Sequence, residues 1–133
     1  MNSQLTVYKA SAGSGKTFTL AREYMTLVIA NPHSYRTILA VTFTNKATEE
    51  MKTRILSQLY GIAHGLEESH GYLEQIKKAL PHLTQKQIEK NADTALSLLI
   101  HNYNYFRVET IDTFFQSVLR NLARELDLTA NLR

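Results

Sequence analysis

Ala10-Ser11-Ala12-Gly13-Ser14-Gly15-Lys16-Thr17 is the stretch that decides the fold predicted for this chain. It follows the alternating, β-branched segment 5–9 and precedes segment 18–29, which contains neither glycine nor proline. A glycine-bearing turn between a strand and a helix, ending in Lys-Thr, is the setting of a phosphate-binding loop. The sequence therefore predicts an α/β fold with an anion site at the start of its first helix.

The chemistry of these residue types supports that prediction. Gly13 and Gly15 can adopt backbone angles that other residues avoid, so consecutive N–H groups can point at one anion. Lys16 can reach the β- and γ-phosphates, and the Thr17 hydroxyl can bind Mg²⁺. The usual pattern begins with glycine where this chain has Ala10. The alternative is a Gly-Ser turn that precedes Lys-Thr by chance, and the flanking strand and helix patterns disfavour it.

Composition sets the class of protein. The chain has 133 residues, 44% of them hydrophobic, which is enough for the core of one domain or part of one. It has no cysteine, which excludes disulfides, thiolate metal sites and a cysteine nucleophile. The longest apolar run, 27–30, is far too short to cross a bilayer, and residues 1–20 lack the apolar core of a signal peptide. We expect a soluble, cytoplasmic protein with no membrane partner.

Charge is distributed unevenly along the chain. Residues 1–60 contain seven Lys/Arg and three Glu, a balance of +4, whereas residues 61–133 contain eight Lys/Arg and nine Asp/Glu, a balance of −1. A polyanion would therefore bind preferentially to the first half. Many ordinary domains are equally asymmetric, so this signal alone does not indicate nucleic-acid binding.

The first sixty residues predict the order β–loop–α–β–α. A helix is expected over 16–30, a buried strand over 37–43 and a second helix capped by Thr44 or Asn45. The apolar run of the strand is typical of a parallel strand covered on both faces. The order implies a parallel sheet with right-handed crossovers. The expected buried faces of the two helices consist of Leu20, Tyr24, Leu27 and Val28, and of Met51, Ile55 and Leu59.

Residues 61–105 predict a helical insertion between strands. A short helix over 67–80 is followed by a break at Pro81-His82 and a longer helix, whose start carries the capping-box spelling Thr84-x-x-Gln87. The histidines of this region lack the spacing of a metal site. The apolar face expected for the longer helix contains Ile88, Ala92, Ala95, Leu96 and Leu99.

Residues 106–133 predict one more strand and one more helix. The alternating segment 106–111 is the strand, and Asp112 or Thr113 is expected to cap the helix. The apolar residues of that helix recur on a single face: Phe115, Val118, Leu119, Leu122 and Leu126.

Three segments together resemble the UvrD/Rep-type superfamily 1 DNA helicases. Residues 10–17 resemble the A-x-A-G-[ST]-G-K-T form of their Walker A loop, in which the first position is commonly alanine. Residues 38–55 resemble their motif Ia, including the core T-F-T-N-K-A. Residues 110–114 are similar to motif Ib, with Asp112 in place of the usual histidine. This variant is similar to the RecB/AddA-like helicase–nuclease branch.

The resemblance implies a RecA-like P-loop NTPase domain that binds ATP and Mg²⁺. Its fold class is a parallel sheet with flanking helices, of which this chain holds an incomplete part: core 1–60, helical insertion 61–105, and strand plus helix 106–133. Lys16 and Thr17 would be catalytic, and Thr17 would bind Mg²⁺. The residues that would contact the nucleotide are Ala12, Gly13, Ser14, Gly15, Lys16, Thr17 and Phe18.

The same resemblance implies contacts with single-stranded DNA. Phe43 would stack on a base, which contributes about 1–3 kcal/mol without sequence preference. Polar side chains would bond the DNA backbone. The ordinary alternatives are a core role for Phe43, a cap role for Asn45 and a solvated charge for Lys46. The candidate DNA-contact residues are Thr42, Phe43, Thr44, Asn45, Lys46, Thr110 and Thr113.

Several parts of a complete motor are missing from these residues. We find no acidic Walker B pair, no arginine finger and no clear adenine-reading glutamine motif, although hydrolysis needs a carboxylate for Mg²⁺ and neutralisation of transition-state charge. We therefore expect the N-terminal piece of a longer helicase or helicase–nuclease in DNA repair or recombination. Its expected partners are the rest of its own chain and a second helicase or nuclease subunit. The alternatives are a P-loop kinase of a small molecule and a non-catalytic nucleotide-binding scaffold.

Overall fold

A parallel sheet forms the centre of the fold. The computed structural model describes the backbone of residues 4–7 and 15–131, and the side chains of residues 17–127. Within these ranges three strands pair in the order β1 (Gln4–Val7), β2 (Ile38–Thr42), β3 (Arg107–Thr110). Both pairings are parallel, with Val7 opposite Val41 and Thr42 opposite Thr110. The α/β class and the parallel sheet predicted from the sequence are confirmed.

The first helix and second strand follow the predicted order. α1 (Gly15–Ala30) leads through the 3₁₀ segment η1 (Pro32–Thr37) to β2. Proline at the start of η1 supplies no backbone N–H and cannot continue α1. The predicted face of α1 is largely confirmed, because Leu20, Tyr24 and Val28 are buried and Leu27 packs against the core.

α2 (Asn45–Ala63) begins with the cap expected from the sequence. The Thr44 hydroxyl accepts a hydrogen bond from the backbone N–H of Ala47 at 3.0 Å, which satisfies one of the donors left open at a helix start. Met51, Ile55 and Leu59 are completely buried. The prediction of this helix and its buried face is confirmed.

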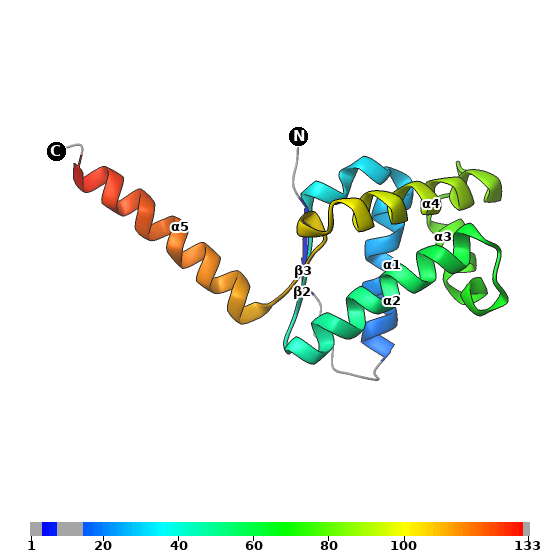
Figure 1. Ribbon diagram of the computed structural model, residues 1–133, viewed down its shortest axis with the longest axis horizontal. Coiled ribbons are helices and arrows are strands. Elements are labelled where there is room, and N and C mark those ends of the chain that lie inside the picture. The colour runs from blue at the N-terminus through cyan, green and yellow to red at the C-terminus, as the bar shows by residue number, and fades with distance from the viewer. Residues whose placement is uncertain (1–3, 8–14, 132–133) are drawn as a thin grey trace.

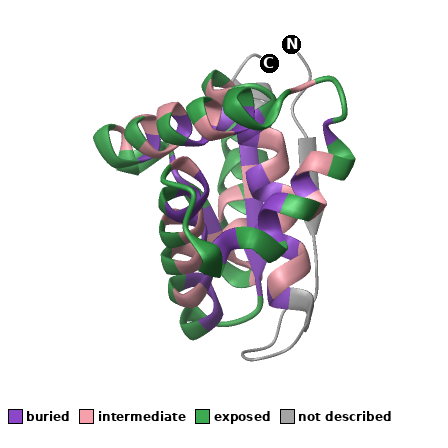
Figure 2. Cartoon of the chain, turned by 90° about the vertical axis from the view of Figure 1, so that its right-hand side faces the viewer, coloured by how far each residue is buried: buried purple, intermediate pink, exposed green. Residues whose placement is uncertain are grey.

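Residues 61–105 pack into the same core as the first sixty residues. They form η2 (Glu67–Ser69), α3 (His70–Ala79), α4 (Gln85–His101) and η3 (Tyr103–Tyr105). Both hydrogen bonds of the predicted capping box are present at the start of α4. α4 packs against α1 and α2, and its apolar face lies in the core cluster. Figure 2 shows the buried segments gathered between these helices.

α5 (Ile111–Asn131) differs from the other helices in its surroundings. The helices α1–α4 lie on one side of the strands, whereas α5 contacts β2 and β3 near its beginning and then runs away from the body (Figure 1). The apolar run of β2 predicted a strand covered by helices on both faces. The structure differs, because helices do not cover both sides of β2 along its length. The apolar stripe of α5 consists of Phe115, Val118, Leu119, Leu122 and Leu126, which are 44–64% exposed.

The cap of α5 is not the one predicted. Thr110, the last residue of β3, accepts a hydrogen bond from the backbone N–H of Thr113 at 3.2 Å. Asp112 lies in the first turn of the helix, where its charge favours the positive end of the helix dipole. The prediction that Asp112 or Thr113 is the cap was wrong because the strand passes into the helix without an intervening loop.

Candidate nucleotide and nucleic-acid site

The candidate site residues converge on one edge of the sheet. Because the strands are parallel, their carboxyl ends lie together, and Thr42 pairs directly with Thr110 at that edge. The first turns of α1, α2 and α5 start from the same edge (Figure 1). Parallel α/β sheets bind ligands outside the carboxyl ends of their strands, so the topology brings the predicted nucleotide and DNA segments together.

The predicted phosphate loop is described only in part. Ala12, Gly13 and Ser14 lie outside the described residues, as does the side chain of Lys16. Gly15 and Lys16 open α1, whose first turn contains no acidic residue. The open backbone N–H groups of this turn and the helix dipole both favour an anion. What is described of this turn fits a phosphate group.

Thr17 lies under the surface of this turn. It is 4% exposed and interacts with other groups of the protein. A threonine hydroxyl at the beginning of such a helix is suited to bind one coordination position of Mg²⁺. Further ligands for a cation are not gathered nearby, since the described residues contain no group of three His, Cys, Asp or Glu side chains.

Phe18 contacts Tyr72 directly and Arg54 through Tyr72, and the sequence predicted no role for either residue. Its ring stacks on Tyr72 of α3, with centroids 4.1 Å apart, and Arg54 of α2 donates to the Tyr72 hydroxyl at 3.3 Å. The helical insertion is thus attached to the turn that opens α1. Arg54 lies within the stretch that resembles motif Ia, but its link to Tyr72 spans eighteen positions and no sequence periodicity indicates it.

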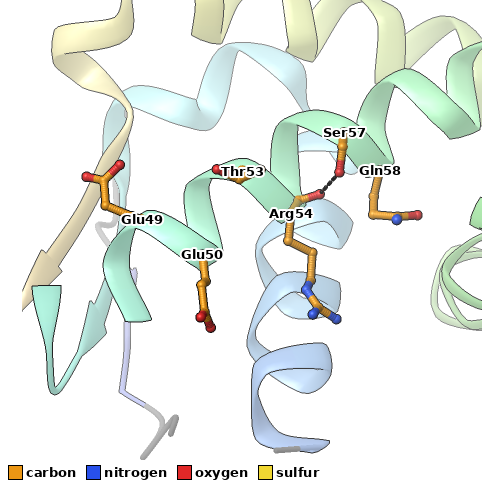
Figure 3. Close-up of a pocket in the computed structure, with 6 residues that line it drawn as sticks. All are labelled: Glu49, Glu50, Thr53, Arg54, Ser57 and Gln58. Atoms are coloured by element: carbon orange, nitrogen blue, oxygen red, sulfur yellow. Dashed lines mark hydrogen bonds between the residues drawn. The ribbon is translucent and has the colours of Figure 1, made fainter. Parts of the chain in front are cut away.

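An open depression of about 560 Å³ lies along the outer face of α2. Figure 3 shows that its lining side chains project from that helix, with Arg54 directed toward α1. The Ser57 hydroxyl donates to the Arg54 carbonyl at 3.1 Å. Two carboxylates, one guanidinium, two hydroxyl groups and one amide line it, so the depression carries both signs of charge. Its described lining residues are Glu49, Glu50, Thr53, Arg54, Ser57 and Gln58.

The segment Phe43–Lys46 presents an aromatic ring and polar groups to solvent. Phe43 is 49% exposed, which excludes the alternative of a core residue in this structure. Asn45 and Lys46 form the exposed first turn of α2, and the Thr44 side chain is the helix cap. An exposed ring beside a helix N-terminus is suited to stack on a base while the helix end contacts a phosphate.

Thr42 is placed differently from its neighbours. It is only 1% exposed, and its hydroxyl lies 2.6 Å from that of Thr48. Direct contact with DNA, as predicted for Thr42, does not fit this burial. Thr48 received no role from the sequence, although it lies inside the segment that resembles motif Ia.

Thr110 and Thr113 form a pair at the start of α5. The Thr110 hydroxyl donates to the Thr113 hydroxyl at 3.0 Å and also caps the helix. Both side chains lie at the edge that carries Phe43, and neither is buried. The Thr113 hydroxyl accepts from Thr110 and keeps its own proton to donate to an outside acceptor such as a phosphate oxygen.

No helix among the described residues combines the length and the apolar character needed to cross a membrane. This agrees with the short apolar runs of the sequence.

Comparison with known proteins identifies relatives. The family model described as UvrD/REP helicase N-terminal domain matches residues 1–133. The chain is 31% identical to the RecBCD enzyme subunit RecB of Borreliella burgdorferi over 126 residues, covering 95% of this chain and 10% of that protein. It is 34% identical to an ATP-dependent helicase/nuclease subunit of Clostridium novyi, covering 93% of this chain and 8% of that protein.

A third relative belongs to a different named group. The ATP-dependent DNA helicase UvrD1 of Mycobacterium leprae is 30% identical over 117 residues, covering 88% of this chain and 14% of that protein. The chain therefore spans about a tenth of the length of the curated relatives it matches. No solved structure gives a significant match.

Proposed function

Because the chain belongs to the UvrD/REP helicase N-terminal domain family, we propose that it is the nucleotide- and DNA-binding part of an ATP-dependent DNA helicase or helicase–nuclease. The observation that carries the proposal is the common edge at which α1, α2 and α5 begin. A kinase of a small molecule is disfavoured, because the helicase family model covers the whole chain. A non-catalytic scaffold is disfavoured by the helicase names of the relatives.

ATP and Mg²⁺ are the proposed ligands of the turn that opens α1. The backbone N–H groups of residues 12–18 would hold the phosphates, and Lys16 would neutralise charge on the β- and γ-phosphates. Thr17 would provide one oxygen ligand to Mg²⁺. The acid-free first turn of α1 supports this assignment, because no carboxylate there opposes the phosphate charge. The nucleotide supplies the phosphoryl bond whose cleavage drives a motor, and these residues orient it. The domain would have the RecA-like fold.

Single-stranded DNA is the proposed ligand of the two neighbouring segments. Phe43 would stack on a base, and Thr44, Asn45 and Lys46 would contact the backbone through the start of α2. Thr110 and Thr113 would contact the same strand from the start of α5. The exposure of Phe43 supports this assignment, since half of a large apolar ring faces water at the end of a buried strand.

The wider role follows from the relatives and is part of the proposal. RecB is named as a subunit of the RecBCD enzyme, and the relative from Clostridium novyi is named as one subunit of a helicase/nuclease. We propose a cytoplasmic role in DNA repair or recombination, together with the remainder of a longer chain and a second helicase or nuclease subunit.

The test is the ATPase activity of the full-length protein with and without single-stranded DNA. We expect DNA to stimulate hydrolysis and Lys16→Ala to lower the stimulated rate by at least about 100-fold, because a phosphate-binding cation acts in the transition state. Lys46→Ala is the matched control, because it removes a lysine at the same edge but outside the phosphate loop. It should weaken DNA binding and leave the rate at saturating DNA nearly unchanged. An ATPase rate that neither rises on addition of DNA nor falls in Lys16→Ala would contradict the proposal.

A further inference from the structure

A buried pair of hydroxyl groups joins the two segments proposed to bind DNA. Thr42 ends β2 and Thr48 lies in the first turns of α2, six positions later; their Oγ1 atoms are 2.6 Å apart. Thr42 is 1% exposed and Thr48 is 9% exposed. Water therefore does not compete for these groups, and their hydrogen bonds are made within the protein.

Two carbonyl groups also lie near the Thr42 hydroxyl. Its oxygen is 3.4 Å from the carbonyl oxygens of Thr44 and of Glu109, and a carbonyl can only accept a hydrogen bond. A threonine hydroxyl has one proton, so when Thr42 donates to either carbonyl it accepts from Thr48. The resulting chain of hydrogen bonds runs from the Thr48 hydroxyl through the Thr42 hydroxyl to the backbone.

These bonds connect parts of the molecule that are distant in sequence. Glu109 directly precedes Thr110, which caps α5 and pairs with Thr42 across the sheet. Thr44 caps α2 and directly follows Phe43. The hydroxyl pair thus ties the turn that carries Phe43 to the strand end that carries Thr110.

We propose that Thr48 is a positioning residue for single-stranded DNA: its hydroxyl holds Thr42, which fixes the segment Phe43–Lys46 relative to Thr110–Thr113. The inference depends on the proposed function, because it assumes that these two segments contact one strand. A base stacked on Phe43 and a phosphate bonded near Thr110 require a fixed separation. Small displacements of such a pair weaken binding without removing any contact residue.

The test compares Thr48→Val with Thr48→Ser in the full-length protein. Valine keeps the shape and loses the hydroxyl, whereas serine keeps the hydroxyl. Binding of fluorescein-labelled oligothymidylate is measured by anisotropy at one salt concentration. We expect Thr48→Val to weaken binding about threefold to tenfold, because the segment Phe43–Lys46 is then less well fixed relative to Thr110–Thr113, and Thr48→Ser to stay within about twofold of the wild type. If Thr48→Val folds poorly, Thr48→Ala removes the same hydroxyl.

A second readout separates positioning from stability. An oligonucleotide with 2-aminopurine, whose fluorescence is quenched by stacking, is measured at saturating protein for both variants and for Phe43→Ala. We expect quenching to fall in Thr48→Val and Phe43→Ala and to be restored in Thr48→Ser. If Phe43→Ala weakens binding while Thr48→Val changes neither affinity nor quenching, the positioning role is wrong and the proposed function stands. If Phe43→Ala also changes nothing, both are wrong.

Discussion

Helices α4 and α5 carry similar sequence patterns and have opposite surroundings. Each has apolar residues at helical spacing along one face. In α4 the residues Ile88, Ala92, Ala95 and Leu99 are completely buried, whereas in α5 every member of the apolar stripe is at least 44% exposed. The difference teaches that periodicity predicts a helix and its apolar face but not what covers that face, because burial depends on the neighbouring elements.

The largest expected difference is in the cost of removing a leucine. Leu99→Ala should destabilise the protein by about 2–5 kcal/mol, because it leaves a cavity in a closed core. Leu122→Ala, the same substitution on a 52% exposed residue of α5, should cost less than about 0.5 kcal/mol. Urea denaturation followed by circular dichroism measures both. Equal losses would show that α5 is packed as tightly as α4 in solution.

A glycine pair tests how tightly the helical insertion is packed. A Cβ added at Gly61 of α2 would overlap the side chain of Ser69, whereas at Gly71 of α3 it would meet nothing within 4 Å. Gly61→Ala should therefore cost about 1–3 kcal/mol through overpacking. Gly71→Ala should be neutral or stabilise by up to about 1 kcal/mol, because alanine favours the helix. A Gly61→Ala variant as stable as the wild type would indicate a loose junction between α2 and η2.

The helix caps extend the comparison to local structure. Thr84→Ala removes the capping box of α4 and should lower global stability by about 1 kcal/mol. Thr110→Ala removes the cap of α5 and should mainly increase fraying of that helix, because little tertiary structure depends on it. Denaturation midpoints report the first effect and amide exchange in residues 113–116 reports the second. A shift of the midpoint by Thr110→Ala that matches Thr84→Ala would contradict this difference.

The smallest expected change is in the pH dependence of stability at alkaline pH. It tests whether the core around Tyr24 excludes water. Burial raises the pKa of the Tyr24 hydroxyl above its ordinary value, and this hydroxyl has no hydrogen-bond partner among the described residues. The unfolded chain loses that proton near pH 10 while the folded chain retains it, so stability falls as the pH rises above about 10. Tyr24→Phe should reduce this slope and leave stability near pH 7 almost unchanged. An unchanged alkaline slope would mean that water reaches Tyr24.

Much of the fold was predictable because its signals are local. The cap at Thr44, the capping box at Thr84 and the face of Met51, Ile55 and Leu59 depend on residues a few positions apart, and the structure confirms each. The exposed face of α5 was not predictable, because no local pattern states which partner a helix has. The Thr110 cap was missed because the alternating pattern extended the predicted strand to residue 111, whereas β3 ends at Thr110 and passes directly into α5.

The sequence predicted which segments form the candidate site but not the contacts that connect them. Lys16 was selected by the phosphate-loop pattern, and Phe43 and Thr110 by their resemblance to helicase motifs. The parallel pairing explains why their segments share an edge. The role of Thr48 and the link from Arg54 through Tyr72 to Phe18 depend on contacts between elements. Sequence spacing carries no information about such contacts.

Hydrogen exchange of the full-length protein tests the central claim most directly, because the claim assigns each ligand to a stretch of backbone. A nonhydrolysable ATP analogue with Mg²⁺ should slow exchange of the amides in residues 13–18. Within this stretch, residues 15–18 form the first turn of α1, where backbone N–H groups lack intrahelical partners. Oligothymidylate should then slow exchange in residues 43–46 and 110–113. Protection by the nucleotide along residues 49–58 of α2, with residues 13–18 unchanged, would contradict the account.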